Sequence, residues 1–505
     1  MHVSLLVGII MFVLDKISYN VKYKYTILDI ILLFYLFLTD VSTSILRTTI
    51  MTILISIDKC FNLKIKKIDI MLLTLIIAII INPFITFQTG FQFSYTISLT
   101  LVLLNKRINK IKSKFKRNLY ISFICFLVSF PICIYYYYQT NFLSILFNLI
   151  VIPIVSIIIF PLSILTFVFP FLYNIFEYSI IILEYINSCF TNLDFGIIIF
   201  PKPSLFIIFI YYSLIFCSLY NQKIYIILLI VMIIHKNYPY LDTSFNLIAI
   251  DIGQGDSLFL KFPNNKGNIL IDTGGIVTYE KETWQRRKTE YSLSNNTIIP
   301  YLKSIGINKL DYLIITHGDY DHMGEAINLV NNFKVEKVIF NCGEYNDLEQ
   351  DLIKVLNKKK IPYYSCIKEL NIADNKLYFL NDKNYGNENH NSSVIYTELN
   401  NYKFLFMGDA GVEVEEDLTE KYNLQNIDVL KVGHHGSKTS SSKNFINEIN
   451  PEYSIISVGK NNRYGHPNDR VLDNLEDSKI YRTDQDGSIM FKIKNNKLQI
   501  ETCMP

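Results

Sequence analysis

The pattern of apolar positions divides the chain into two parts. Up to about residue 235, stretches of Ile, Leu, Phe and Tyr carry few charges, whereas beyond Leu247 the sequence is mixed and rich in Lys, Asn, Asp and Glu. A helix needs about 20 mainly apolar residues to cross a bilayer. Apolar runs of that order recur at 25–39, 68–86, 119–138, 142–169, 172–190, 203–220 and 223–235, with shorter ones at 3–14, 44–57 and 90–104. We therefore predict a polytopic α-helical membrane domain at residues 1–240, with about nine or ten helices.

Charged loops predict the orientation of this domain. The loops at 59–67 and 106–117 are rich in Lys and Arg and contain no acidic residue. Both should be cytoplasmic by the positive-inside rule, and we prefer this role for 106–117 to DNA binding. Because both loops are expected on the same side, an even number of spans must join them. A break at Asn82-Pro83 fits this, since it splits the stretch 68–104 into two helices. Five predicted spans follow the second loop, so the rest of the chain is expected on the outer face.

Polar residues also lie within or beside the apolar runs. They are Arg47, Asn82, Gln88, Gln92 and Ser94. Polar groups inside a membrane usually face the interior of a helix bundle or an aqueous path. Two interpretations stay open: a pore, or hydrogen bonds that hold helices together.

Residues 241–505 alternate between short apolar strands and helical segments. Strands are expected at 246–251, 257–262, 268–272, 311–316, 336–340, 376–380, 393–399, 403–408, 427–432, 453–458, 479–482 and 488–493. Helices are expected near 297–305, 322–332, 348–359, 412–422 and 467–476. Meander strands followed by strand–helix alternation predict an α/β domain of two sheets flanked by helices, an αββα sandwich.

Histidine and aspartate are concentrated directly after one predicted strand. His317, Asp319, Asp321 and His322 stand within six residues, a density that suits a divalent metal ion. Similar positions after other predicted strands are held by Asp272, Asp409 and His434. The alternative is a polar loop without metal.

Composition adds two limits. The net charge of +3 is too near neutral to indicate nucleic-acid or membrane binding by itself. None of the eight cysteines has C-x-x-C spacing, so no zinc ribbon or redox motif is indicated. Cys342 and Cys366 could form a disulfide if the second domain is external, but the sequence does not fix their distance.

Several motifs together resemble a known family. They are DIGQGDS at 251–257, LIDTGG at 270–275, the segment after His317, MGD at 407–409 and VGHHGS at 432–437. This set resembles metallo-β-lactamase-fold hydrolases, and DIGQGDS and HHGS are particularly similar to ComEC-type competence proteins, the DNA-internalisation channels of natural transformation. Further similar segments are YGHP at 464–467, RTDQDG at 482–487, SILR at 44–47, Asn82-Pro83 and GFQFS at 90–94.

The sequence departs from that family in two places. Family members begin with further membrane helices and a β-rich domain, so the chain is expected to be N-terminally shortened. The usual H-x-H-x-D-H motif has a carboxylate, Asp319, in place of one imidazole. That exchange favours Mn or Mg, with Zn as the alternative. The usual third histidine before the Asp409 strand is not evident, although His390 and Asn391 lie near its place.

The resemblance implies a site with two divalent ions. The expected ligands are His317, Asp319, Asp321, His322, Asp409 and His434. Asp409 would bridge the two ions. Asp321, His322 and His434 would hold one ion, and His317 and Asp319 would hold the other. Such a pair lowers the pKa of a bound water and stabilises charge on a phosphate during in-line displacement.

Other residues are expected to act around the ions. The expected catalytic side chains are Asp321, His435 and His466, although both histidines could instead pack at the edge of the site. Asp272 and Asp256 are expected to orient ligands, with turn formation the stronger interpretation for Asp256. Phosphate or DNA contacts are expected from Ser437, Lys431, Arg286 and Arg287. The last two belong to a basic segment around Trp284 that could stack on single-stranded DNA or simply be solvated.

Three functions remain under consideration. The first is an inner-membrane DNA uptake channel that passes single-stranded DNA, fused to a metal-dependent nuclease on the outer face. Its expected partners are single-stranded DNA, membrane lipid, a DNA receptor, a cytoplasmic translocation ATPase and further copies of itself. The second is a membrane-anchored metallohydrolase that acts on another phosphoester without transport, and the third is a metal-free binding domain. The motifs and the polar residues among the apolar runs favour the first.

Overall fold

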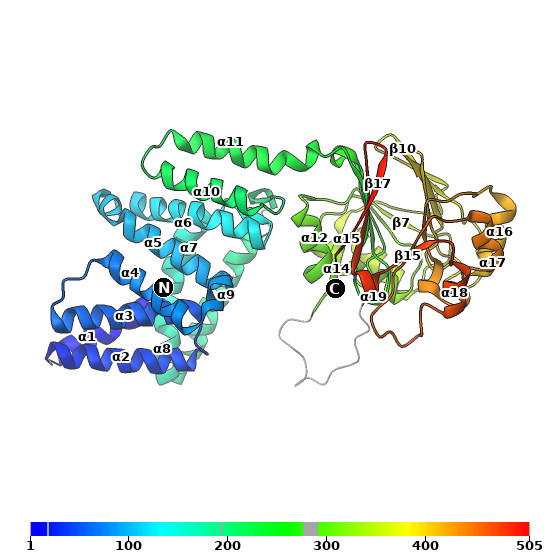
Figure 1. The fold of residues 1–505 in the computed structure, drawn as a ribbon. Helices are drawn as coiled ribbons and strands as arrows, with labels where there is room; N and C mark the ends of the chain where they lie inside the picture. The colour runs from blue at the N-terminus through cyan, green and yellow to red at the C-terminus, as the bar shows by residue number, and fades with distance from the viewer. Residues whose placement is uncertain (1, 18–19, 192–193, 276–290, 504–505) are drawn as a thin grey trace. The chain divides into compact units, whose positions relative to one another are not determined.

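The computed structural model describes residues 2–17, 20–191, 194–275 and 291–503. It contains two compact units, Met1–Met232 and Ile233–Pro505 (Figure 1). We call them the helical unit and the sheet unit. The limits 1–240 and 241–505 remain predictions, and the basic segment with Trp284, Arg286 and Arg287 lies outside the described residues.

The helical unit consists mainly of α-helices. Their bounds are α1 His2–Lys16, α2 Val21–Leu38, α3 Thr43–Phe61, α4 Lys67–Ile81, α5 Thr89–Lys110, α6 Lys114–Tyr136, α7 Ser144–Pro153, α8 Phe160–Val168, α9 Tyr173–Thr191, α10 Leu205–Ser218 and α11 Ile224–Asn237. A π-helical segment, Ile154–Ile159, joins α7 to α8, and short strands β1 Gln139–Asn141 and β2 Ile197–Ile199 pair antiparallel.

The break predicted at Asn82-Pro83 is present. Pro83 lacks the N–H that would continue α4, and it opens a 3₁₀ turn, Pro83–Phe87. The Asn82 Oδ1 atom accepts a hydrogen bond from the Phe84 N–H at 3.0 Å and so caps that turn. The stretch 68–104 therefore forms two helices, α4 and α5.

Within the described ranges, three helical segments are long and apolar enough to cross a membrane. They are Lys114–Tyr136, Ser144–Val168 and Ile224–Leu241, and α10 is a shorter apolar helix. Large apolar side chains such as Phe37, Ile80 and Phe167 are exposed, the last by 90%. Exposure on this scale suits lipid better than water. The helical membrane-type architecture is confirmed, whereas the count of nine or ten spans stays a prediction.

The sheet unit has two sheets between two layers of helices (Figure 1). One sheet has the order β17-β16-β3-β4-β5-β6-β7-β8 and the other β15-β14-β13-β12-β11-β10-β9. Strand bounds are β3 Phe245–Ala249, β4 Leu258–Lys261, β5 Asn268–Ile271, β6 Tyr312–Ile314, β7 Val338–Phe340, β8 Tyr363–Ser365, β9 Glu369–Ile372, β10 Asn375–Phe379, β11 Ile395–Leu399, β12 Tyr402–Phe406, β13 Val429–Lys431, β14 Tyr453–Ile456, β15 Lys479–Arg482, β16 Ser488–Lys494 and β17 Lys497–Cys503.

Helices cover the outer face of each sheet. The helices α12 Ile299–Ser304, α13 Tyr320–Met323, α14 Ala326–Asn332 and α15 Asp347–Lys359 belong to one half of the unit. The helices α16 Val412–Lys421, α17 Lys443–Ile449, α18 Asp469–Asn474 and α19 Thr483–Asp486 belong to the other.

Alternation along the strands produces this layering. In β3, Phe245 and Leu247 join the core between the sheets, whereas Ile248 joins the core beneath α12, α14 and α15. Successive side chains of a strand point to opposite faces, so one strand serves two cores. The predicted αββα sandwich is confirmed. The prediction missed β8, β9, β17, α17 and α19. Strands β8 and β17 are edge strands with no buried position, β9 has only four residues, and α17 and α19 have seven and four.

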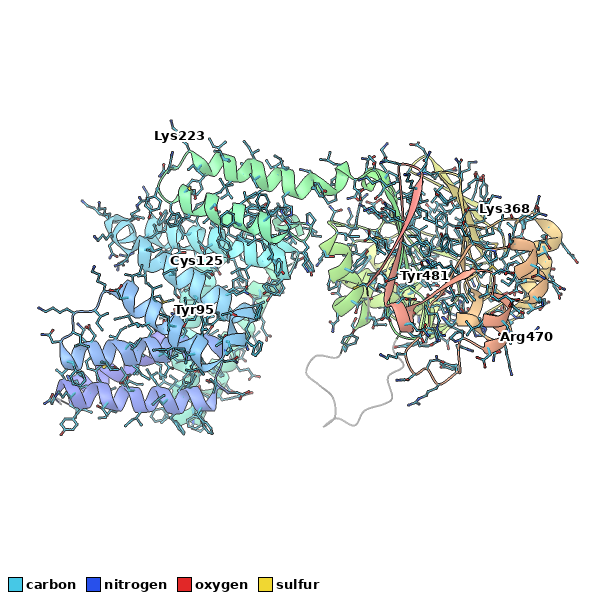
Figure 2. All side chains as sticks on the ribbon, in the orientation of Figure 1. Tyr95, Cys125, Lys223, Lys368, Arg470 and Tyr481 are labelled. Carbon is cyan, nitrogen blue, oxygen red and sulfur yellow. A yellow bond between two sulfur atoms is a disulfide. The ribbon has the colours of Figure 1, made fainter. Side chains whose placement is uncertain are left out.

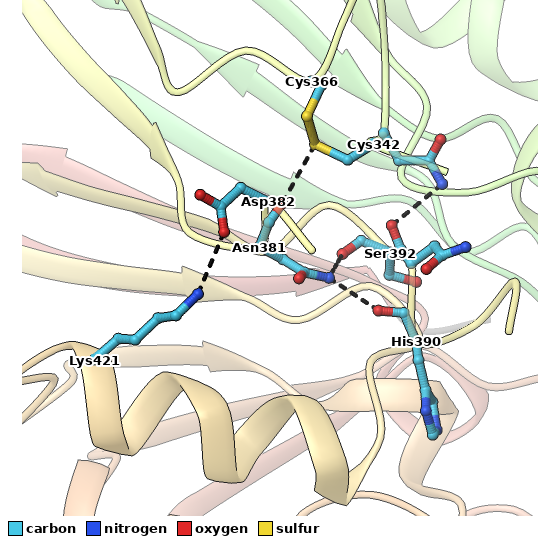
Figure 3. The surroundings of a disulfide bond; sticks show 9 residues. Cys342, Cys366, Asn381, Asp382, His390, Ser392 and Lys421 are labelled. Atoms are coloured by element: carbon cyan, nitrogen blue, oxygen red, sulfur yellow. Dashed lines mark hydrogen bonds and ion pairs between the residues drawn. A yellow bond between two sulfur atoms is a disulfide. The ribbon is translucent and has the colours of Figure 1, made fainter. Parts of the chain in front are cut away.

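A disulfide joins Cys342, which follows β7, to Cys366, which follows β8 (Figure 3). The Cys342 Sγ lies 3.7 Å from the carbonyl oxygen of Asn381. The Asn381 side-chain amide donates hydrogen bonds of 2.9 Å to the carbonyl oxygens of His390 and Ser392. The bridge therefore braces the segment that carries Ser392, which reaches the site described next.

Candidate metal centre

Four strand ends meet at one edge of the sandwich. Asp272 follows β5, His317 follows β6, Asp409 follows β12, and His434 and His435 follow β13. Strands β5 and β6 are parallel neighbours, as are β12 and β13, so their carboxyl ends lie side by side. This is the placement expected from the sequence.

The loop after β6 is fixed by close backbone packing. The Asp256 N–H donates to the carbonyl oxygen of Asp321 at 3.2 Å, and the Thr273 N–H donates to that of His322 at 2.7 Å. A side chain at Gly255, where φ is +125°, would meet the Asp321 carbonyl oxygen at 2.2 Å. Gly255 of DIGQGDS therefore allows two backbone segments to meet beside the site.

Buried polar atoms converge here without hydrogen bonds. They are His317 Nε2, His322 Nε2, His435 Nε2 and Asp409 Oδ1; none of them has a hydrogen-bond partner among the described residues, although His322 Nε2 lies 3.1 Å from Asp409 Oδ1. One ligand atom each from His317, His322 and Asp409 lies within 4.8 Å of the others, and the same holds for Asp321, His322 and His435. We call these five residues the histidine–aspartate cluster. Unbonded buried polar atoms are costly in an apo protein, and a shared metal ion removes that cost, so the residues present fit divalent metal.

Asp272 contacts His322 through His322 Nδ1, on the side of the ring away from its Nε2 atom in the cluster. Its Oδ2 lies 2.8 Å from His322 Nδ1, and it accepts from the Thr316 hydroxyl at 2.6 Å and the Thr316 N–H at 2.8 Å. Asp272 and His322 are both fully buried. A carboxylate on one ring nitrogen fixes the imidazole so that the other nitrogen faces the metal.

His317 is positioned by hydroxyl groups. Its Nδ1 lies 3.1 Å from the Thr316 hydroxyl and 3.2 Å from the Ser392 hydroxyl. The Ser392 hydroxyl also accepts from the Asp409 N–H at 3.0 Å. Ser392 was not among the expected site residues, since a serine in a polar loop gives no distinctive sequence signal. It connects the disulfide-braced segment to two expected ligands.

The two adjacent histidines after β13 occupy different places. His435 is buried; its Nδ1 lies 2.9 Å from the carbonyl oxygen of Ser457, and its Nε2 lies 3.3 Å from Asp321 Oδ2 and 3.6 Å from Asp409 Oδ2. The side chain of His434 is 26% exposed, with its Nε2 3.7 Å from Asp409 Oδ2. The geometry thus puts His435, predicted to be catalytic, beside Asp321 and His322, where His434 was expected.

Charge in the cluster is arranged to hold a cation. Burial lowers the pKa of His322, but Asp409 and Asp272 outweigh burial and raise it well above its usual value. Burial also lowers the pKa of His435, but the carboxylates of Asp409 and Asp256 outweigh burial and raise this pKa to about 10. The pKa of Asp409 is well below its usual range, because the neighbouring histidines outweigh its burial. The carboxylates therefore stabilise positive charge at the imidazoles, and a metal ion would supply that charge in place of protons.

A buried ion pair lies behind His435. Lys431 is fully buried, and its Nζ lies 2.5 Å from Asp256 Oδ2. The other oxygen of Asp256 lies 3.5 Å from His435 Nδ1. The expected phosphate contact of Lys431 does not suit this placement, because an ammonium group inside the core is out of reach of a polymer such as DNA. Asp256 supports His435, whereas the sequence favoured a turn role for it.

The remaining expected residues surround the cluster. The Asp319 Oδ2 atom lies 3.6 Å from His317 Nε2. The Asp319 side chain is 44% exposed, so the site is open to solvent at this residue. The ring of His466 lies 5.9 Å from that of His434. The Ser437 hydroxyl bonds to Thr439 at 3.0 Å. The His390 Nδ1 atom lies 3.2 Å from Glu413 Oε2, so this ring is not part of the histidine–aspartate cluster.

Comparisons with known proteins agree with this architecture. Residues 250–460 match the metallo-beta-lactamase superfamily, and residues 1–223 match the family described as Competence protein. The sheet unit is thus a metallo-β-lactamase domain that follows a competence-protein membrane region. With both regions in this order, the chain resembles the ComEC-type competence proteins.

Two curated relatives and one solved structure illustrate the similarity. The chain is 29% identical over 519 residues to ComE operon protein 3 of Bacillus subtilis, covering 98% of this chain and 67% of that protein. It is 27% identical over 258 residues to Competence protein ComA of Neisseria gonorrhoeae, covering 48% of this chain and 31% of that protein. A solved metal-dependent hydrolase of Parabacteroides distasonis aligns with 48% of this chain and 94% of its own, with 14% identity and a TM-score of 0.29.

The buried ion pair generates a test. Lys431→Met leaves the Asp256 carboxylate buried without its cation, which should lower the free energy of unfolding by about 3–5 kcal/mol. The double variant Lys431→Met/Asp256→Asn removes both charges and should recover most of that loss. Scanning calorimetry of the full chain in detergent measures both. A single variant as stable as the parent would contradict the ion pair.

Proposed function

We propose that this protein acts in DNA uptake, with the helical unit passing single-stranded DNA and the sheet unit hydrolysing phosphodiester bonds. The observation that carries the hydrolase proposal is the convergence of unbonded buried His and Asp atoms at the strand ends. Similarity to competence proteins supports the DNA substrate. Other competence proteins are the expected partners.

Two ions would be held by separate parts of the site. Asp321, His322 and His435 would hold one and His317 with Asp319 the other, and Asp409 would contact both. When bound, such ions activate a water and stabilise charge on the reacting phosphate. Three carboxylates among the ligands favour Mn or Mg, with Zn as the alternative.

The chain's own residues would orient the reaction. Asp272 and the Ser457 carbonyl fix the rings of His322 and His435, so each keeps one nitrogen directed into the cluster. The exposed side chains of Asp319 and His434 mark the side from which a strand can approach. Burial, with His434 and His435, lowers the pKa of His466, which favours the uncharged ring as a hydrogen-bonding group for the substrate.

Asp409 provides the direct test of hydrolysis. Asp409→Asn weakens the contact with both ions and should abolish cleavage of single-stranded DNA. Asp319→Ala affects one ion and should leave partial activity that excess manganese restores. Cleavage is measured with purified full chain in detergent. The matched control is His390→Ala, since this histidine bonds to Glu413 and should be replaceable without loss. Near-normal cleavage by folded Asp409→Asn would refute the assignment.

We also propose that the sheet unit lies on the outer face of the membrane. The five spans predicted after the basic loop 106–117 are an odd number, which puts the sheet unit on the side opposite that loop. The disulfide between Cys342 and Cys366 supports the same side, since disulfides persist outside the cytoplasm.

Reporter fusions test this orientation. Alkaline phosphatase fused after Pro505 should be active, because it folds only outside the cytoplasm, and green fluorescent protein at the same place should be dark. A fusion within 106–117 should show the reverse pattern and serves as the control. A fluorescent fusion after Pro505 would place the sheet unit inside and disprove the orientation.

A further inference from the structure

The helices α3 and α5 border a cavity within the helical unit. Its volume is about 310 Å³, at the lower end of the range of small-molecule sites. Its polar lining includes Ser44, Arg47 and Thr48 from α3 and Ser94 and Ser98 from α5. Positions three and four residues apart share one face of a helix, so each helix presents a polar stripe to this cavity.

A glycine allows the two helices to approach. A side chain at Gly90, near the start of α5, would meet the hydroxyl of Thr43 on α3 at 3.0 Å. Phe93, one turn further along α5, adds an aromatic ring to the lining. The cavity therefore combines hydroxyl groups, one cation and one aromatic surface.

Arg47 lacks a negative partner among the described residues. Its Nε donates to the Ser94 hydroxyl at 2.6 Å, and its guanidinium carbon lies 6.0 Å from the ring centre of Tyr95, which Figure 2 marks on α5. The carboxylate of Asp29, on the neighbouring helix α2, instead accepts a hydrogen bond from Ser56 at 2.9 Å. A guanidinium has five N–H donors, and a cation in an apolar helical unit is costly unless it is paired.

Gln92 shows the opposite behaviour. Its amide donates to the carbonyl oxygen of Thr86 and to the Tyr136 hydroxyl, both at 3.0 Å. Gln92 therefore holds structural elements together, which was one interpretation of the polar residues. Arg47 keeps N–H donors available toward the cavity, which matches the interpretation that these polar residues line a pore.

We propose that this cavity binds a phosphodiester group of single-stranded DNA through Arg47. The inference rests on the proposed passage of a strand through the helical unit. The planar guanidinium matches two phosphate oxygens, and hydroxyl groups can donate to the same anion. Phe93 offers a face on which a base of any identity can stack. The polar lining covers about one turn of each helix, and its hydroxyl groups and cation suit a phosphate group better than the acyl chains of a lipid.

Binding of a labelled oligodeoxythymidylate tests the proposal. The full chain is placed in phosphatidylcholine nanodiscs with EDTA, so that no hydrolysis occurs, and affinity is measured over a range of salt concentrations. Each phosphate neutralised in a single strand contributes about 0.7 to the slope of log affinity against log salt. Arg47→Gln should reduce the magnitude of that slope by about 0.7. Arg47→Lys keeps the charge and should keep the slope while lowering affinity.

Two controls separate this site from general effects. Arg117→Gln removes the same charge elsewhere in the helical unit and should leave the slope unchanged. Gln92→Leu loosens contacts between elements without changing charge and should also leave it unchanged. If Arg47→Gln does not fold, Arg47→Lys decides: affinity equal to that of the parent overturns the proposal.

The outcomes distinguish three accounts. Failure of the parent protein to bind the oligonucleotide would contradict the proposed DNA function itself. Binding by the parent with an unchanged slope in Arg47→Gln would overturn only the phosphodiester site. A third outcome is that the parent protein retains phosphatidylglycerol and Arg47→Gln does not, while oligonucleotide binding is unchanged. That result would identify a lipid headgroup site and would also overturn the proposal.

Discussion

The sheet unit depends on the buried carboxylate of Asp409. The imidazoles of His317, His322, His434 and His435 lie within 4.0 Å of it, and the shortest of these distances is 3.1 Å, from Asp409 Oδ1 to His322 Nε2. An isolated carboxylate would not tolerate this burial, and the surrounding histidines hold its pKa low. The αββα sandwich brings these charges together at this edge, because the ligands follow the ends of different strands.

The supporting residues make the cluster rigid. Asp272 and Thr316 fix one ring, Ser392 fixes another, and the buried pair of Lys431 and Asp256 stands behind a third. These contacts come from both sheets, so the site forms only when the two halves of the sandwich are assembled. Hydrogen-bonded support of this kind is what keeps metal ligands at fixed positions.

The sequence predicted the sandwich and the strand ends, because alternation and the spacing of His and Asp are local properties. It could not separate His434 from His435, since both adopt left-handed backbone conformations, with φ of +46° and +53°, that tertiary contacts impose. The burial of Lys431 was also beyond reach, because a lysine after an apolar strand has the same pattern whether its partner is DNA or Asp256. Ser392 was not predicted either, because a serine in a polar loop has no distinctive sequence pattern.

Metal content measures the central claim most directly. The purified full chain, loaded with manganese and then freed of unbound ions, should retain about two ions per chain by elemental analysis, since the proposed ligands form two sets that share Asp409. Asp409→Ala should retain neither ion while remaining folded. No bound metal in the parent protein after loading with manganese, magnesium or zinc, or full retention by Asp409→Ala, would contradict a centre built on this carboxylate.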